Sequence, residues 1–562
     1  MFTAIDPNRE DYSYLGKESL KTLSRGYLTK SGDTKTLAIE RLDEMITTAE
    51  DILGFKLPTL RTGVKRGWFS PSSPNWSNFG AGRGLPISCN GSVMDDSLDS
   101  ILFKLAEIGK MTQQGAGTSL YMGKLRPFGS KIASGGTSDG PTHFARLVQE
   151  YITVISQSNV RRGSCCVYLD VDHADIDDWL LMRSTTGGVH HPIQHLDFAV
   201  NLTDEFMESL ETDPKGSRNR NLMAKIRNKR RETGRPFIFF PGNANRNLAP
   251  WFKRAGLKVL ASNLCTEIML PSTPYESFVC NLSSVNLLFY HEWKGTNFIR
   301  EVLYYLDAVM SDYIAKTANM SFMDHAHASA KRWRALGLGV LGYHSMLQSR
   351  LIPFESPEAF ELNNEIFAYI QEESLAASRD LARIFGEPEG MEGTGYRNAT
   401  VNAIAPTQSS SIICGTVSKS IEPWEAVIFE NDNAKGVFTQ YNPFFVELAQ
   451  KRGKDTPAMW ESVMRAGGRV DHLDWLTQRE KDVFKPWIDI SQKAIVQQAI
   501  DRQVYIDQGQ SLNIVLPLDA TMKEDVDLIK MAHKGGLKSL YYRNGENPSQ
   551  KLAREACVAC EA

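Results

Sequence analysis

The sequence of 562 residues lacks a long apolar run, a strong net charge and a dense set of cysteines. Its longest apolar runs, such as residues 336–341, are far shorter than the roughly 20 residues that cross a bilayer. Acidic residues stand at positions 6, 10 and 11, where a signal peptide would have an apolar core. The formal net charge of −3 gives no overall attraction to nucleic acid or membrane. We therefore expect a cytoplasmic protein that binds neither.

The eight cysteines are too few for the disulfide framework of a secreted protein of this length. Catalytic, redox or plain buried roles are expected instead. Only Cys557 and Cys560 have the spacing of a metal site, and one such pair supplies two of the four ligands that tetrahedral zinc needs. The histidines at 190, 191, 195, 325 and 327 lack carboxylate or cysteine partners at suitable spacing. We therefore predict no bound metal, and we interpret the Cys557/Cys560 pair as an exposed dithiol.

Short apolar runs alternate with amphipathic helical patterns along most of the chain. The runs predicted as buried strands are 165–171, 196–202, 236–240, 400–405 and 511–516. The predicted helices include 97–113, 141–158, 299–316, 357–384 and 521–534. Because no Gly/Ser linker divides them, the alternation predicts one large α/β domain over residues 66–543. We expect a helical region before it, over residues 1–65, and a mobile tail after it, over residues 544–562.

One short segment, Ser262-Asn-Leu-Cys-Thr-Glu267, carries the most chemical information, and Cys280 follows Cys265 after 15 residues. A cysteine in an apolar run is most often a small core residue. Here, however, an amide at Asn263 and a carboxyl at Glu267 each stand two residues from the sulfur. A reactive thiol, a hydrogen-bonding group and a proton acceptor therefore share one window. The second sulfur can supply electrons.

This segment resembles the active-site loop of the large, catalytic subunit of ribonucleotide reductase, and other motifs of that family follow in the same order from about residue 65 onward. The resemblance implies a class I ribonucleoside-diphosphate reductase, an enzyme that makes deoxyribonucleotides for DNA synthesis. It also implies a ten-stranded α/β barrel of two five-stranded halves. Cys265 would then lie on a finger loop through the centre of the barrel.

The resemblance assigns a role to each reactive residue of the loop. Cys265 becomes the thiyl radical that removes the ribose 3′-hydrogen, Glu267 accepts the proton of the 3′-hydroxyl, and Asn263 holds the sugar. Cys89, in Pro-Ile-Ser-Cys, and Cys280 form the dithiol whose oxidation to a disulfide yields two electrons.

Two further pairs resemble the family's delivery routes for electrons and for the radical. The tail pair Cys557/Cys560 would carry electrons from thioredoxin or glutaredoxin to the internal disulfide. Adjacent tyrosines in an apolar strand are usually packing residues. Tyr541 and Tyr542 nevertheless resemble the relay that brings a radical from a small β subunit. Since the metal cofactor of that subunit generates the radical, this chain is expected to bind no cofactor of its own.

Substrate and effector sites are implied by the same resemblance. The Ser-rich loop at 405–411, otherwise an N-capped turn, matches the family's phosphate loop. The residues predicted to bind the ribonucleoside diphosphate are Ser73, Ser88, Gly117, Asn263, Glu267, Pro406, Thr407, Gln408, Ser409, Ser410 and Ser411. An acid at the start of a helix is commonly only a cap, but here it matches the effector site. The residues predicted to bind a dNTP or ATP effector, with Mg²⁺, are Asp96, Ser97, Leu98, Arg126 and Arg161.

The sequence also departs from many members of the family. Only 88 residues precede Cys89, which leaves no room for both a helical region and the N-terminal ATP-cone that switches overall activity. We expect a homodimer or a dimer induced by dNTP. Two alternatives stay open: an adenosylcobalamin-dependent (class II) reductase, and an inactive nucleotide-binding regulatory subunit. A glycyl-radical enzyme is disfavoured, because the sequence has neither its terminal glycine motif nor a four-cysteine zinc site.

Two patterns are given structural interpretations. Gly337, Gly339 and Gly342 have dinucleotide-binding spacing, but a helical pattern precedes them, and they resemble a Gly-rich helix start of the family. Nine Lys and Arg residues between 215 and 235 lack interleaved aromatic residues, so we expect a solvated helix face rather than a nucleic-acid arm.

Overall fold

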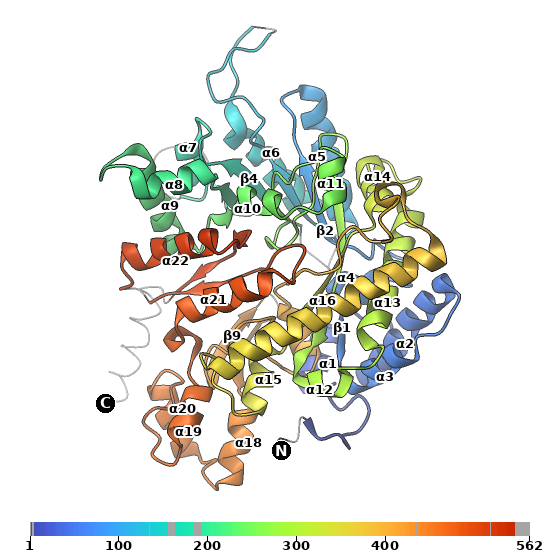
Figure 1. Cartoon of the computed structure of the whole chain (residues 1–562), viewed down its shortest axis with the longest axis vertical. Coiled ribbons are helices and arrows are strands. Elements are labelled where there is room, and N and C mark those ends of the chain that lie inside the picture. The colour runs from blue at the N-terminus through green and yellow to red at the C-terminus, as the bar shows by residue number, and fades with distance from the viewer. Residues whose placement is uncertain are drawn as a thin grey trace.

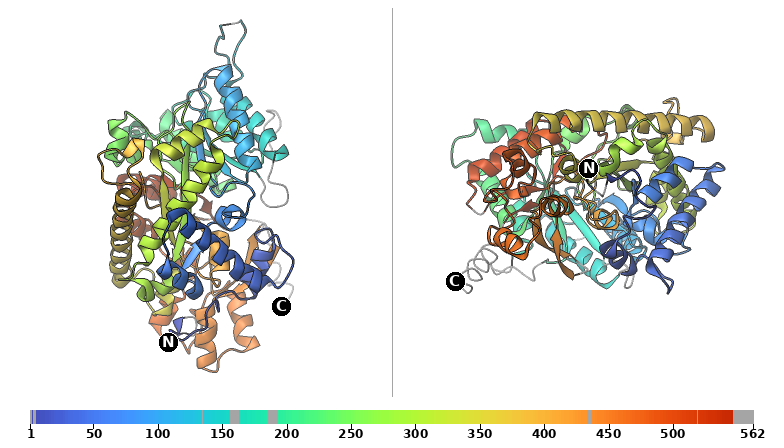
Figure 2. Two further views of the ribbon diagram at one scale, coloured as in Figure 1. Left: turned by 90° about the vertical axis from the view of Figure 1, so that its right-hand side faces the viewer. Right: turned by 90° about the horizontal axis from the view of Figure 1, so that it is seen from below.

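The computed structural model describes residues 2–545 without 3, 4, 134, 156–162, 185–192, 434, 435 and 518, and without the side chains of 431–438. In this part of the chain, every helix is too short or too polar to cross a membrane. The molecule is a barrel of strands with helices packed around it (Figure 1). The long helix α16 (Pro357–Phe385) runs along one side (Figure 2).

Five parallel strands form the first half of the barrel. They pair in chain order, each with the next. Their bounds are β2 Cys89–Val93, β3 Gly117–Tyr121, β4 Ser164–Asp170, β5 Asp197–Asn201 and β6 Phe237–Phe239. The predicted strands at 165–171, 196–202 and 236–240 are thus confirmed as β4, β5 and β6. Parallel neighbours require crossover connections, which explains why helices such as α5 (Leu98–Gln113) and α6 (Gly140–Val154) lie between them in sequence.

Five further parallel segments form the second half and close the ring. β7 (Phe278–Asn286) pairs with β8 (Leu336–Leu341). Bridges then join β8 to residues 400–405 and these to Gln510, and β11 (Ile514–Val515) pairs with β13 (Arg543–Asn544). The two halves meet antiparallel at β2–β7 and at β6–β12, where β12 is Ser539–Leu540. β12 and β13 follow each other in one run of chain and count as a single strand of the barrel. The ring therefore has ten strands in two five-stranded halves, as predicted.

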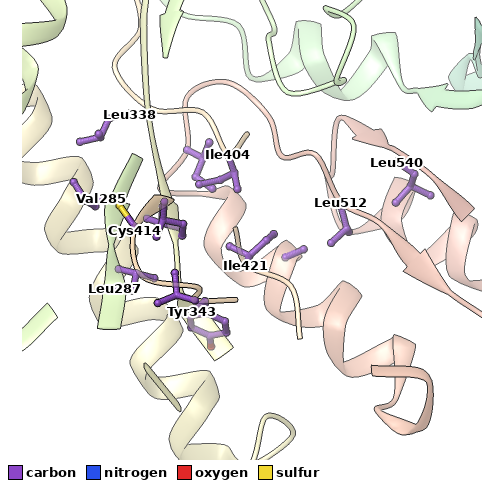
Figure 3. Packing of buried hydrophobic residues seen from close by; sticks show 14 of the residues in the cluster. Val285, Leu287, Leu338, Tyr343, Ile404, Cys414, Ile421, Leu512 and Leu540 are labelled. Atoms are coloured by element: carbon purple, nitrogen blue, oxygen red, sulfur yellow. The ribbon is translucent and has the colours of Figure 1, made fainter. Parts of the chain in front are cut away.

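Side chains alternate between the inside and the outside of this barrel, as the period of a strand requires. Along β4, Cys166 and Tyr168 belong to an inner apolar cluster, whereas Cys165 and Val167 belong to the cluster beneath the helices. In the second half, Leu338, Ile404, Leu512 and Leu540 come from four successive strands and pack in the outer cluster (Figure 3). The same alternation on β7 puts Val279 outside and Cys280 inside.

The outer helices agree with the periodicity of the sequence. The predicted helices at 97–113, 299–316, 357–384 and 521–534 are α5, α13 (Phe298–Thr317), α16 (Pro357–Phe385) and α22 (Met522–Lys534). At the N-terminus, α1 (Lys17–Ser24), α2 (Thr34–Leu53) and α3 (Pro58–Arg66) pack against the barrel's helices and share its outer cluster. The proposed domain boundaries at residues 65 and 543 stay predictions.

Two interpretations of the sequence are wrong in part. The Gly-rich segment is the buried strand β8, and only Gly342 precedes a helix, α15 (Tyr343–Ser349). A β-carbon at Gly337 would come within 2.9 Å of the Ala403 β-carbon, so the glycine lets two strands approach closely. The basic helix α9 (Arg218–Thr233) is not a wholly solvated face either, because Arg227 and Arg230 are buried.

Candidate active site

Residues 259–270 form a finger loop that runs through the barrel, as predicted for Cys265. Side chains from the surrounding strands donate hydrogen bonds of 2.6–2.9 Å to the carbonyl oxygens of this loop. The donors are Ser119, Tyr168, Asn201, Ser511 and Ser539. Because they come from both halves of the barrel, the position of the loop depends on the closed ring.

The tip of the loop has a strained backbone next to the reactive sulfur. Thr266 has a φ of 65°, which is unfavourable for a β-branched residue. The side-chain oxygen of Asn263 accepts hydrogen bonds from the N–H groups of Glu267 (3.0 Å) and Ile268 (3.1 Å), and this stabilises the tight tip. Asn263 therefore stabilises the conformation of the loop. It does not line the cavity described next.

A cavity of about 490 Å³ opens beside the loop tip. Its walls bring together the three sulfurs predicted to react, those of Cys89, Cys265 and Cys280, with Glu267 and the tyrosine pair. Ser73, Ser88 and the loop residues 406–410, which are predicted to bind substrate, also line it. Gly117 and Ser411 do not. Gly117 lies under the loop instead, where a β-carbon would come 3.0 Å from Leu264.

Cys89 and Cys280 are direct partners across the antiparallel pair β2–β7. Opposite residues of such a pair have Cα atoms about 4.5–5.5 Å apart, which lies within the range that a disulfide spans. Cys89 is partly exposed to the cavity, whereas Cys280 is fully buried. The fold therefore places opposite each other two cysteines that are 191 positions apart in sequence.

Burial determines the protonation of the groups at the loop tip. Desolvation, and then the nearby carboxyl of Glu267, raise the pKa of the Cys265 thiol well above its ordinary range, so the sulfur keeps its hydrogen at neutral pH. Desolvation also raises the pKa of Glu267 to about 7. The Ser511 hydroxyl, which donates to the Cys265 carbonyl, lies 3.1 Å from a carboxyl oxygen of Glu267 and can accept from the protonated acid. A carboxyl that titrates near neutrality is suited to accept and return a proton.

The tyrosine pair forms a continuous path from Cys265 outward. Tyr541 and Cys265 both line the cavity, and each contributes to the shifted pKa of the other. The Tyr541 and Tyr542 ring centroids lie 4.3 Å apart. Arg235 donates to the Tyr542 hydroxyl at 2.9 Å and is paired with Asp197. Desolvation raises the pKa of Tyr541 well above the ordinary value and that of Tyr542 to about 12, so both phenols are protonated.

The structure adds residues to this site that the sequence analysis missed. Arg235, and Arg230, which donates to the Tyr541 carbonyl at 3.1 Å, both come from the stretch interpreted as solvated. Glu422 and Asn513 line the cavity and are hydrogen-bonded to each other, and desolvation raises the pKa of Glu422 to about 7. Only Glu422 had a signal, because it stands in an Ile-Glu-Pro segment (residues 421–423) downstream of the predicted phosphate loop.

The loop predicted to bind phosphate leads into a short helix. α17 spans Gln408–Ile413, so the N–H groups of its first turn have no partner within the helix. Thr407 stands before it with a φ of 51°, and its hydroxyl accepts from the Ser420 N–H at 2.7 Å. Strained β-branched residues thus mark both the loop tip and the phosphate loop.

The predicted effector residues lie at the start of α5. Arg126 donates to both carboxylate oxygens of Asp96, at 2.7 Å from its side chain and 3.3 Å from its backbone. Ser97 caps α5 by accepting from the Ser100 N–H, and Leu98 is exposed. Arg161, like Cys557 and Cys560 of the tail, lies outside the described residues.

Comparisons with known proteins agree on one family. Residues 87–217, 215–394 and 388–543 match the family described as "Ribonucleotide reductase, barrel domain". The putative ribonucleoside-diphosphate reductase large subunit of Frog virus 3 is 34% identical, over 89% of this chain and 92% of its own. The large subunit of Invertebrate iridescent virus 3 is 31% identical, over 84% of this chain and 85% of its own. The class Id ribonucleotide reductase alpha subunit of Actinobacillus ureae has a similar structure, with a TM-score of 0.89, 44% identity, and coverage of 96% of this chain and 99% of its own.

Proposed function

We propose that this chain, which belongs to the ribonucleotide reductase family and is a ribonucleoside-diphosphate reductase large subunit, works by thiyl-radical chemistry at Cys265. The observation that carries the proposal is the convergence of a protonated thiol, a titratable carboxyl and a cross-strand cysteine pair on one cavity. These are the groups that removal of a 2′-hydroxyl requires: a hydrogen-atom acceptor, a base and a two-electron reductant.

The reaction assigns one task to each group. The Cys265 thiyl removes the 3′-hydrogen of the ribose and later returns it. Glu267 accepts the 3′-hydroxyl proton, which weakens the bond to the 2′-hydroxyl so that the latter leaves as water once protonated. Cys89 and Cys280 supply two electrons and two protons, and they end as a disulfide. Asn263 holds the loop tip in shape, which places Cys265 and Glu267 toward the sugar.

The radical is proposed to arrive from a separate small subunit, as in class I enzymes. Each step along Tyr542, Tyr541 and Cys265 moves a hydrogen between groups that are protonated at neutral pH. The relay would be superfluous in an adenosylcobalamin-dependent enzyme, which generates its radical in place. It therefore favours class I over that alternative, and the reactive groups retained in the cavity argue against an inactive regulatory subunit.

A second copy of the chain is proposed to cover the face beside Asp96. Apolar side chains stay exposed there at helical spacing, Leu98 and Leu102 on α5 and Leu147, Tyr151 and Val154 on α6. Two such helices from each copy can bury one another. A dNTP held at Asp96 would lie at the edge of that interface and favour dimerisation. Sedimentation with and without dTTP tests this; a Leu102→Asp chain should stay monomeric under both conditions.

A reduction assay tests the proposed function as a whole. The purified chain is incubated with each ribonucleoside diphosphate, a dithiol, an effector and candidate small subunits, and deoxynucleotide formation is measured. Product is expected only when a small subunit is present. Product with adenosylcobalamin alone would assign the chain to class II, and product under neither condition would favour a regulatory role.

A further inference from the structure

Gln508 contacts the buried sulfur of the cysteine pair and has no role in the chemistry described above. Its side-chain amide donates to the Cys280 sulfur at 3.3 Å and to the Leu336 carbonyl at 3.0 Å. The amide oxygen accepts from the Met269 N–H at 3.1 Å. These partners settle the orientation of the amide, since the opposite orientation would place oxygen against the Leu336 carbonyl and N–H against N–H.

The backbone around Gln508 is fixed from several sides. The Lys538 ammonium donates to its carbonyl at 2.7 Å, and the Gln503 amide donates to the same oxygen at 3.0 Å. The Asp507 carboxylate accepts from two consecutive backbone N–H groups, those of Val401 and Asn402. The donor is therefore held against the sulfur by buried contacts to three segments of the barrel.

The Cys280 sulfur has no access to solvent. The residue is fully buried, and even a β-carbon at Gly337 would come 3.3 Å from the sulfur. Desolvation raises the pKa of this thiol, the Gln508 hydrogen bond lowers it, and the carboxyls of Glu267 and Asp507 raise it further. A thiolate at this position would depend on the protein, not on water, for hydrogen bonding.

We propose that Gln508 is a catalytic residue of disulfide reduction, and that its N–H stabilises Cys280 as the departing thiolate. Cys89 is the partly exposed sulfur and takes the attack. A reductant thiolate forms a bond to the Cys89 sulfur, the Cys89–Cys280 bond breaks, and its electron pair stays on Cys280 beside the amide. The second thiolate of the reductant then releases Cys89. The two protons that the reductant thiols lose on becoming thiolates end on Cys89 and Cys280, and the dithiol reductant is oxidised by two electrons to its disulfide.

This inference rests on the proposed Cys89–Cys280 redox pair, and it is tested without a small subunit or nucleotide. In a chain whose two tail cysteines are serine, the internal pair is oxidised with diamide and then reduced with dithiothreitol. Alkylation followed by mass spectrometry of the Cys89 and Cys280 peptides measures the rate. Gln508→Met removes the donor at similar length. Reduction is expected to slow about ten- to a hundredfold, because a hydrogen bond to a charged group is lost.

Matched variants separate this effect from damage to the fold. Gln510→Met removes another buried amide two residues away, which contacts Arg502 and not a sulfur, and should leave the rate unchanged. Gln508→Glu keeps an acceptor for Met269 and, when protonated, a donor for Leu336, and it should also be slow. The midpoint potential of the pair near pH 7 should hardly move, since burial keeps Cys280 a neutral thiol in the reduced protein.

The outcomes distinguish this inference from the proposed function. A wild-type rate in Gln508→Met and Gln508→Glu would overturn the role of Gln508 alone. An equal slowing in Gln510→Met, or a large shift of the midpoint potential, would assign Gln508 a structural role. If Cys89 and Cys280 form no disulfide even in the parent chain, the proposed redox pair itself is wrong.

Discussion

At the scale of single residues, burial has a different consequence for each reacting group. It keeps Cys265 a thiol, which is the form that can lose a hydrogen atom. It brings Glu267 to a pKa of about 7, where a carboxyl can both accept and release a proton. The same desolvation makes a Cys280 thiolate costly, and the Gln508 amide partly offsets that cost. Desolvation inside the barrel therefore determines which of these groups carry a proton at neutral pH.

Replacing the radical-bearing sulfur should end turnover without unfolding the protein. Cys265→Ser removes a weak S–H bond and leaves a strong O–H bond, so no comparable radical can form. We expect no detectable deoxynucleotide and an unchanged thermal midpoint. Cys165→Ser makes the same substitution on the outer face of β4 and should remain active. Full-rate product from Cys265→Ser would rule out its assignment as the thiyl.

Replacing the base should inactivate the enzyme and stabilise its fold. The pKa of Glu267 rises from 4.5 to about 7 on folding, so the folded state holds a proton that the unfolded state releases between these values. Stability is thus lost as pH rises through this window. The side chain in Glu267→Gln does not titrate. The free energy of unfolding of this variant should therefore exceed that of wild type by nothing below pH 4.5 and by about 3 kcal/mol above pH 7. Urea unfolding from pH 4 to pH 8 measures this. A difference in unfolding free energy that stays constant with pH would mean that burial does not shift the pKa of this carboxyl.

At the scale of elements, the periodicity of hydrophobic residues predicted individual strands and helices, but it did not predict that the strands close into a ring. β4, β5 and α16 follow directly from their patterns, because one segment determines them. The second half of the barrel does not follow from its pattern. It includes short bridged segments, and β8 contains two glycines because the neighbouring segment leaves no room for a β-carbon. Family resemblance supplied Cys89, Tyr541 and Tyr542. Arg230 and Gln508 left no signal, because their roles depend on contacts with residues hundreds of positions away.

The tyrosine pair at β12–β13 should be essential for activity and neutral for folding. Tyr541→Phe and Tyr542→Phe each remove the phenolic hydrogen and keep the ring that packs on Phe237. We expect each to abolish reduction with the small subunit present, while substrate affinity measured by calorimetry stays within about twofold of wild type, a difference under 0.5 kcal/mol. Tyr343→Phe, which removes a buried hydroxyl outside the path, is the control and should stay active. Activity in either relay variant would contradict a hydrogen-transferring path.

The tail should be required by protein reductants and dispensable for small ones. With Cys557 and Cys560 both changed to serine, thioredoxin- or glutaredoxin-driven turnover should vanish, because a bulky protein cannot reach the cysteine pair inside the barrel. Dithiothreitol is small enough to reach the partly exposed Cys89 and should still support turnover. Initial rates under each reductant decide between the alternatives. Equal loss with both would mean that the tail does not act as a shuttle.

At the scale of the whole molecule, the proposed effector site is connected to the active site through shared strands and helices. β2 carries Cys89 at its start and leads directly to Asp96 and α5 at its end. α5 is tied to the barrel through buried Glu107, which pairs with Lys104 of the same helix and accepts a hydrogen bond from Ser92 of β2. A ligand that moves α5 therefore acts on the strand of the redox pair. By contrast, the described part of the first 66 residues contains α1, α2 and α3, which pack on the helices around the barrel.

The expectation that these residues include no ATP-cone predicts specificity control without an off switch. The chain has a candidate dNTP site at Asp96 and Arg126, where bound dATP would act on substrate choice. Bound dATP should therefore favour pyrimidine substrates and should not inhibit at high concentration. Asp96→Ala loses a charge-assisted hydrogen bond to the effector ribose, worth about 1.5–3 kcal/mol, so effector affinity should fall roughly ten- to a hundredfold. Asp95→Ala, which removes the adjacent acid beside Lys124, is the matched control and should bind effector normally. Reduction rate is measured against dATP concentration in all three proteins. A steep fall to zero that ATP reverses would mean that another part of this chain performs the role of the cone.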